Sequence, residues 1–126
     1  SEKATIFGFE NEFIQVVLNI INNSLDAFEG KKDVEKLIFI NIYKKEDSVI
    51  ISIKDNAGGI KDTVIDRVFE PYFTTKHQSQ GNCIGLYMSS KIIHEHFNGE
   101  IFVQNEEIFI EDCKYLGAKF YILLPN

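Results

Sequence analysis

Residues 13–28 read FIQVVLNIINNSLDAF, and this stretch is the one from which the fold can be argued. Its apolar residues recur at the three- and four-residue spacing of one face of an amphipathic helix. The residues that we assign to this face are Ile14, Val17, Leu18, Ile21, Leu25 and Phe28. The stretch therefore predicts a helix that packs on a core through one side.

The other side of this helix carries an unusual group of amides. Asn19, Asn22 and Asn23 stand close together, although asparagine is a poor helix former because its side chain competes for the backbone. Aligned amides can coordinate a hard cation through oxygen, or hydrogen-bond a polar ligand. A solvated helix face that carries asparagine by chance is the alternative.

The composition bounds the class of protein. The chain has 126 residues, of which 44% are hydrophobic and 25% are charged, and this fits one globular domain with its own core. The net charge of −6 argues against a nucleic-acid-binding protein, because phosphate backbones favour basic surfaces. No apolar run approaches the ~18 residues of a membrane-spanning helix, and the first residues lack the pattern of a signal peptide. Cys83 and Cys113 suggest neither a disulfide nor a metal site, so we expect a cytoplasmic location.

Several further segments predict strands. Residues 35–44 and 48–54 are rich in β-branched and aromatic residues and flank a polar turn, which predicts a hairpin. Residues 100–104 and 119–124 predict two more strands, with a connection between them that we leave unassigned, and residues 4–7 predict a short one. The order of the elements favours an α+β two-layer fold with helices on one face of a mainly antiparallel sheet.

Two more helices are expected in the second half of the chain. Residues 62–68 predict a short helix, and residues 85–97 predict a longer one that ends at Asn98 and the glycine after it. Between these helices, residues 74–82 contain no apolar side chain, which indicates a mobile polar loop.

The loop DNAGGI, residues 55–60, follows the second strand of the hairpin. A carboxylate at Asp55 can accept a hydrogen bond from an exocyclic amine such as that of adenine. Gly58 and Gly59 allow the backbone to approach a flat ring, because neither carries a Cβ. A plain Asp-Asn turn between two elements is the alternative.

The segment GNCIGL, residues 81–86, stands where the polar loop meets the next helix. Backbone N–H groups at a helix N-terminus bind anions, most often phosphate, but a simple turn explains the glycines equally well. The loop lacks the Gly-Lys-Ser or Gly-Lys-Thr ending of a P-loop, so that nucleotide-binding fold is disfavoured.

Taken together and in this order, the segments resemble the catalytic ATP-binding domain of sensor histidine kinases, which belongs to the GHKL superfamily with gyrase-type and chaperone-type ATPases. QVVLNIINNSLDAF resembles the N box, DNAGGI the first glycine box, FEPYFTTK the F box, GNCIGLYMSSKII the second glycine box and GAKFYILLP the closing strand. The resemblance runs from about Glu10 to Pro125. It implies a Bergerat-type ATP-binding fold, an α/β sandwich in which helices cover a mixed, mainly antiparallel sheet. Residues 1–126 would form this single domain, in a longer protein that also holds a phosphoacceptor helical domain.

The resemblance implies ATP and Mg²⁺ as cofactors, with a phosphate end and an adenine end. At the phosphate end, Asn23 would coordinate Mg²⁺, Asn19 would assist at the phosphates, and Asp26 would lie one turn further along. Residues 74–84 would form a lid. The other residues implied at the phosphates are Gly81, Gly85 and Leu86, together with Lys76, for which a solvated lysine is the alternative.

At the adenine end, the resemblance implies that Asp55 binds the adenine amine and that Gly59 lines the base pocket, in a loop that also includes Ala57 and Ile60. Ala57 replaces the first glycine of the commonest pattern. The residues Ala118 and Lys119 stand where many relatives carry threonine near the adenine, and Cys83 stands where the second glycine box usually has glycine. If position 83 needs a positive φ, its cysteine adds strain of about 1 kcal/mol.

The residue one turn before Asn23 bears on the reaction. Superfamily members that hydrolyse ATP carry a carboxylate there, whereas this chain has Asn19, whose amide cannot act as a general base. This favours phosphoryl transfer to another protein, in which the domain mainly positions the nucleotide and its metal. His77, His94 and His96 lack the sequence pattern of a phosphoacceptor segment.

By resemblance, the acceptor is a histidine on the dimerisation domain of the same protein, and a response regulator follows in two-component signal transduction. We therefore expect a protein histidine kinase catalytic domain with little activity alone. We expect it to be a monomer without contacts to nucleic acid or, from this segment, to a membrane; the sequence leaves open whether the parent protein is membrane-anchored. An anti-sigma-type serine kinase and a degenerate nucleotide-binding module are the alternatives.

Overall fold

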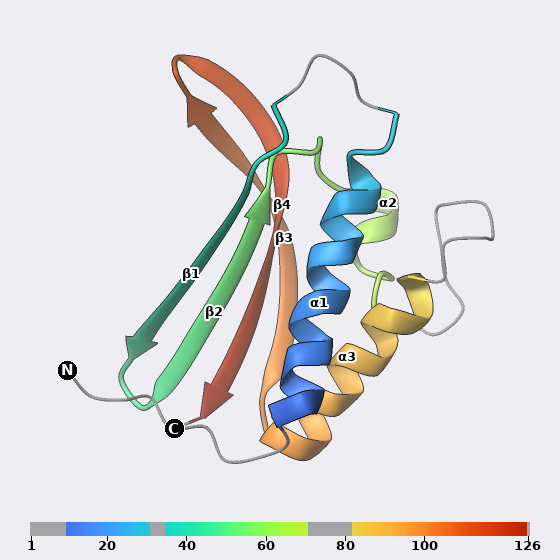
Figure 1. The fold of residues 1–126 in the computed structure, drawn as a ribbon, viewed down its shortest axis with the longest axis vertical. Coiled ribbons are helices and arrows are strands. Elements are labelled where there is room, and N and C mark those ends of the chain that lie inside the picture. Colours follow the sequence, from blue (N-terminus) through green and yellow to red (C-terminus); the bar gives the residue numbers. More distant parts are fainter. Residues whose placement is uncertain (1–9, 31–34, 71–81, 126) are drawn as a thin grey trace.

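A computed structural model describes residues 10–30, 35–70 and 82–125. The elements in chain order are α1 (Glu10–Ala27), β1 (Ile38–Lys45), β2 (Ser48–Asp55), α2 (Asp62–Ile65), α3 (Asn82–Phe97), β3 (Glu100–Ile110) and β4 (Cys113–Pro125). They form two layers, with α1 and α3 side by side against one face of a twisted sheet (Figure 1). The predicted two-layer α/β sandwich is confirmed. Among the described helices, none has both the length and the apolarity that crossing a bilayer would require.

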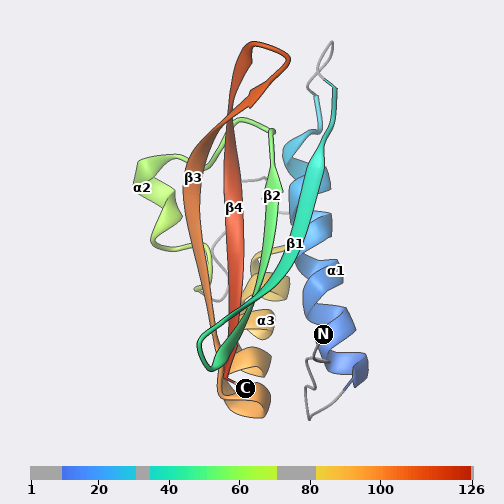
Figure 2. The ribbon, with the colours of Figure 1, turned by 90° about the vertical axis from the view of Figure 1, so that its left-hand side faces the viewer.

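The described sheet has the strand order β1-β2-β4-β3, and each of its three pairings is antiparallel. Figure 2 shows the four strands from the side that the long helices leave uncovered. The central strands β2 and β4 supply most of the core that α1 and α3 cover. Their buried apolar residues are Val49, Ile51, Ile53, Ala118, Phe120, Ile122 and Leu124. The predicted hairpin of the first two strands is confirmed, with Glu46 at a positive φ of 57° in its turn.

Helix α1 forms as predicted, but the predicted apolar face was wrong in part. The helix buries the stripe Val16, Ile20 and Ser24, together with Phe28 just after its end. Val17 and Ile21 pack only at the margin of the core. Three residues of the predicted apolar face are instead about half exposed, namely Ile14, Leu18 and Leu25.

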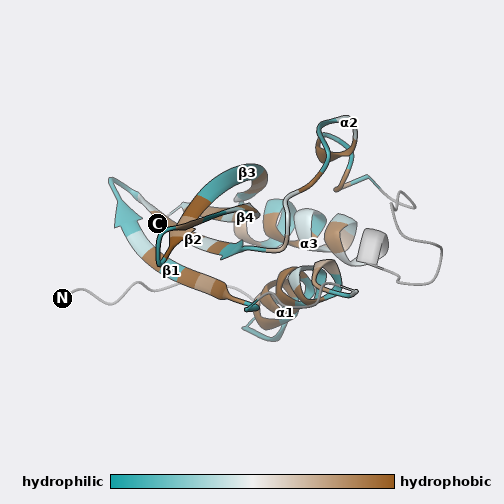
Figure 3. Cartoon of the chain, turned by 90° about the horizontal axis from the view of Figure 1, so that it is seen from above, coloured by the Kyte–Doolittle hydropathy of each residue, from teal (hydrophilic) through white to brown (hydrophobic). Residues whose placement is uncertain are grey.

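The buried face was misassigned because α1 carries apolar residues on more than one side, which Figure 3 shows as brown bands around the helix. Periodicity cannot choose between neighbouring stripes that are both apolar. The contacts of α1 with β2 and α3 decide which stripe is buried, and the buried stripe is the one that contains Ser24.

Helix α3 forms as predicted and buries Leu86, Ser89, Ile93 and Phe97. Asn98, at a φ of 55°, ends the helix as expected. The helix begins at Asn82, so the backbone of Cys83 is helical and is not among the residues with positive φ. The positive φ on which strain at position 83 would depend is therefore not found there.

The β3–β4 hairpin is longer than the sequence predicted. Its strands continue through the segment that we left unassigned and meet at Glu111 and Asp112, whose φ angles are 51° and 68°. Two consecutive residues with positive φ are typical of the tight turns that suit twisted hairpins. The hairpin extends beyond the ends of β1 and β2 (Figure 1) and thus reaches the loop that follows Asp55.

Candidate functional site

The carboxylate of Asp55, at the end of β2, is buried, with 2% of the residue exposed. Its Oδ1 accepts hydrogen bonds from the backbone N–H groups of Ala57 at 3.0 Å and Ala118 at 3.3 Å. Its Oδ2 accepts a hydrogen bond from the hydroxyl of Ser24 at 2.8 Å. These donors offset the cost of removing a carboxylate from water and hold it in one orientation.

The glycine loop that follows Asp55 is held by the β3–β4 hairpin. The side chain of Asn105 accepts a hydrogen bond from the N–H of Ile60 at 2.8 Å and donates one to its carbonyl at 2.6 Å. The N–H of Gly58 donates to the carbonyl of Leu116 at 2.8 Å. Gly58 and Gly59 have φ angles of 108° and 80°, a region that glycine adopts without steric cost.

Gly117 lies directly against the backbone of Asp55. A Cβ at this position would stand 1.6 Å from the carbonyl oxygen of Asp55, and a Cβ on Gly59 would stand 2.9 Å from Oδ1 of Asn105. Both contacts are shorter than real carbon atoms tolerate. The close approach of β4 and the loop thus depends on residues without side chains.

The first of the predicted amides, Asn19, connects α1 to the first turns of α3. Its Nδ2 donates to the carbonyl of Gly85 at 3.3 Å and to the hydroxyl of Ser89 at 3.0 Å. Its Oδ1 accepts a hydrogen bond from Gln15 at 3.0 Å. Leu86, next to Gly85, is buried in the core.

Asn23 lies one turn after Asn19 and is half-buried. Within the described residues, its amide has no hydrogen bond or ion pair. An amide oxygen of this kind fits the hard-oxygen preference of Mg²⁺, which usually takes one or two protein ligands together with phosphates and water. The described part of the chain holds no group of three or more His, Cys, Asp or Glu residues that could bind a metal ion alone. Asp26, in the last turn of α1, is also half-buried.

Ser24 brings the two predicted groups of residues together, because it follows Asn23 in α1 and donates to Asp55. The groups are Asn19, Asn23, Gly85 and Leu86 where α1 meets α3, and Asp55, Ala57, Gly59 and Ile60 at the end of β2. Lys76 and Gly81 lie outside the described residues, as does most of the FEPYFTTK segment.

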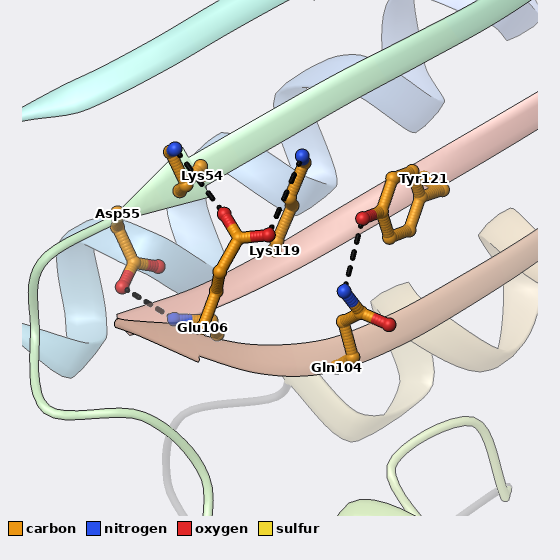
Figure 4. A network of polar contacts seen from close by, with 7 residues as sticks. Lys54, Asp55, Gln104, Glu106, Lys119 and Tyr121 are labelled. Carbon is orange, nitrogen blue, oxygen red and sulfur yellow. Dashed lines mark hydrogen bonds and ion pairs between the residues drawn. The ribbon is translucent and has the colours of Figure 1, made fainter. Parts of the chain in front are cut away.

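Lys119 lies on the opposite face of the sheet from the carboxylate of Asp55. It forms an ion pair with Glu106 at 3.6 Å, and Glu106 also contacts Lys54 at 3.2 Å (Figure 4). Burial disfavours the charge of Lys119, but the hydrogen bond with Tyr121 and the Glu106 carboxylate outweigh it and hold its pKa above the ordinary value. Lys119 therefore takes no part around Asp55, and Ala118 contributes only its backbone N–H there.

A shallow depression is also found on this helix-free face, under the tip of the β3–β4 hairpin. It does not include the Asp55 carboxylate. Its lining residues are Phe39, Asn41, Lys54, Ile108, Phe109 and Ile110.

Sequence reasoning missed Ser24 and Asn105. Ser24 would have been noticed had the buried stripe of α1 been assigned correctly, because it is then the polar member of an apolar row. Asn105 gave no local sign, since it acts on a residue 45 positions away.

The fold and these contacts define a two-layer domain with a buried aspartate before a glycine loop and an amide-bearing helix beside it. Residues 8–126 match the family of histidine kinase-, DNA gyrase B- and HSP90-like ATPases. The chain belongs to this family.

Within it, the chain is 36% identical over 121 residues to sporulation kinase E of Bacillus subtilis, covering 95% of this chain and 14% of that protein. It is 34% identical over 116 residues to a probable C4-dicarboxylate sensor kinase of Halalkalibacterium halodurans, covering 92% of this chain and 20% of that protein. The chain thus spans a fifth or less of these two relatives.

Two solved structures have the same fold. The mycobacterial sensor histidine kinase MprB superposes with a TM-score of 0.76 at 19% identity, over 95% of this chain and 76% of that one. Full-length ShkA in complex with AMPPNP superposes with a TM-score of 0.75 at 22% identity, over 99% of this chain and 24% of that one. At these identities, the likeness concerns the fold alone.

Proposed function

We propose that this chain is the catalytic domain of a sensor histidine kinase, which binds ATP with Mg²⁺ and donates the γ-phosphoryl group to a histidine on a separate dimerisation domain of the same protein. Family membership and the kinase names of the two relatives, one of them a probable sensor kinase, support this proposal. The observation that carries it is the buried carboxylate of Asp55, held by three donors beside a glycine loop.

At the adenine end, Asp55 accepts a hydrogen bond from the exocyclic amine of the base. Gly59 and Ile60 line the base pocket with backbone that Asn105 holds in place, and Ala57 lies between them and Asp55. Because these groups are ordered by the chain itself, binding of the base costs little conformational entropy.

At the phosphate end, the amide oxygen of Asn23 is the ligand for Mg²⁺, which neutralises phosphate charge during phosphoryl transfer. Asn19 positions the start of α3 through Gly85. The backbone there, at Gly85 and Leu86, contributes to binding the phosphates, with Asp26, Lys76 and Gly81 as further members of the site. Neither amide has the proton affinity to activate water, so transfer to a protein histidine is favoured over hydrolysis.

We further propose that residues 1–126 are one domain of a longer cytoplasmic or membrane-anchored kinase. Its partners are the phosphoacceptor domain of the same protein and a downstream response regulator. The relatives support this arrangement, since each is several times longer than this chain.

Titration calorimetry with a non-hydrolysable ATP analogue and Mg²⁺ tests the binding step. Saturable heat is expected, whereas no heat at millimolar nucleotide would leave an inert module. Labelled ATP, incubated with this chain and a separately supplied dimerisation domain, tests the transfer step. Acid-labile phosphate on histidine is expected; stable phosphate on serine would instead indicate an anti-sigma-type serine kinase.

A further inference from the structure

Ser24 holds an unusual position in α1. It is the third member of the stripe that faces the core, after Val16 and Ile20, and it is completely buried. A buried hydroxyl is costly unless it is hydrogen-bonded, and Ser24 meets this need by donating to Oδ2 of Asp55 at 2.8 Å. The one polar residue of the stripe thus lies where the neighbouring group is a carboxylate.

The two oxygens of Asp55 differ in their contacts. Oδ1 accepts two hydrogen bonds, from the N–H groups of Ala57 and Ala118. Within the described residues, Oδ2 accepts one, from Ser24. A carboxylate oxygen can accept two, so Oδ2 is the atom that retains capacity for a ligand's donor.

The hydroxyl of Ser24 also helps to fix the rotation of the carboxylate. The torsion that turns this group is broad in the absence of partners. Because a carboxylate is planar, its two oxygens turn together, and the N–H groups on Oδ1 and the hydroxyl on Oδ2 restrain the same rotation. The bond from Ser24 also occupies one of the two acceptor positions of Oδ2, so a residue of α1 helps to decide which position is left for a ligand's donor.

We propose that Ser24 is a positioning residue that sets the preference of the site for purines with an exocyclic amine at carbon 6. It acts through Oδ2 of Asp55, to which its hydroxyl donates, and is not itself the group that recognises the base. This inference rests on the proposed function, since it takes Asp55 as the group that recognises the base.

The test compares the affinities for ATP and for purine riboside triphosphate, which lacks the amine, by titration calorimetry with Mg²⁺. The native chain should prefer ATP by about tenfold or more, the effect of one hydrogen bond to a charged acceptor. Ser24→Ala should reduce this preference to about threefold or less, while the affinity for the analogue without the amine stays nearly unchanged. Ser24→Thr, which keeps the hydroxyl, should retain the native preference.

The control is Ser52→Ala, which removes the hydroxyl of another buried serine, on β2 and 2% exposed. It should leave the preference as it is. If Ser24→Ala does not fold, Ser24→Cys, a similar shape with a weak donor, provides the same comparison.

Two results would overturn the inference, namely an unchanged preference in the variant or an equal loss of affinity for both nucleotides, which would indicate a structural role only. Failure of the proposed function differs from both, because the native chain would then bind neither nucleotide.

Discussion

The adenine end and the phosphate end of the candidate site are built in different ways. At the adenine end, Asp55 accepts three hydrogen bonds and Asn105 makes two to Ile60. At the phosphate end, Asn23 has no partner among the described residues, and Asn19 is engaged with α3.

This difference separates two strategies of binding. A recognition group that the fold has already fixed loses little entropy when its ligand arrives. An amide without a partner in the protein acquires one only when the nucleotide binds, because Mg²⁺ is bound by phosphates and water as well as by the protein. We therefore expect changes at the adenine end to affect both stability and affinity, and changes at Asn23 to affect mainly Mg²⁺-dependent affinity.

The largest effect is expected at Gly117. In Gly117→Ala, the new Cβ would collide with the backbone of Asp55, and such overpacking should lower the free energy of unfolding by about 3 kcal/mol. Urea unfolding measures the loss. The matched control is Gly85→Ala, whose Cβ would make an ordinary contact of 3.5 Å with Asn19 and should stabilise the helix by about 0.5–1 kcal/mol. Equal stability of the two variants would show that β4 does not pack closely against the backbone of Asp55.

Next in size is the effect of Asp55→Asn. The variant removes the charged acceptor, and nucleotide affinity should fall by about 1–3 kcal/mol, with or without Mg²⁺. Calorimetry checks this result. Asp47→Asn, in the exposed turn between β1 and β2, should bind as the native chain does. An Asp55→Asn variant with native affinity would place base recognition elsewhere.

A smaller and more selective effect is expected for Asn23→Ala. Loss of the amide ligand should remove about tenfold in affinity for ATP in the presence of Mg²⁺ and change little when the metal is chelated. Unfolding by urea should be nearly unaffected, because the side chain has no partner among the described residues. Asn22→Ala, at an exposed neighbouring position, is the control, and equal losses in the two variants would contradict the role of Asn23.

The smallest effect is expected on the helix-free face. Glu106→Gln should cost less than about 1 kcal/mol at neutral pH, as is usual for ion pairs near the surface, and should leave nucleotide affinity unchanged. The pKa of Lys119 is raised in the folded chain. The contribution of this ion pair to the free energy of unfolding is therefore complete at a pH below the ordinary lysine pKa, and it is lost as the pH rises through the pKa of Lys119 in the folded state. Urea unfolding at neutral and strongly alkaline pH tests this, and a large change in affinity would refute the separation of the two faces.

The parts of the fold that could be predicted are those with a local cause. The helix at residues 13–28, the turn at Asn98 and the hairpin of β1 and β2 follow from periodicity and turn chemistry. The loop that follows Asp55 could be predicted from its glycines, because glycine needs no partner to adopt a positive φ; that this loop admits a flat ring stays a prediction.

The parts that could not be predicted depend on residues far apart in the chain. The buried stripe of α1 is chosen by its neighbours β2 and α3, since apolar residues lie on several sides of the helix. The contact of Asn105 with Ile60 exists only after the β3–β4 hairpin has formed. Its strands were assigned too short, because the segment around Gly117 lacks the alternation that marks a strand.

The central claim is that the Asp55 loop and Asn23 are two ends of one nucleotide site. The most direct measurement is a crystal structure of this chain with a non-hydrolysable ATP analogue and Mg²⁺. The account predicts the adenine amine within hydrogen-bonding distance of Oδ2 of Asp55, and the metal ion bound by the amide oxygen of Asn23. A nucleotide bound elsewhere, for example in the depression on the helix-free face, would contradict it.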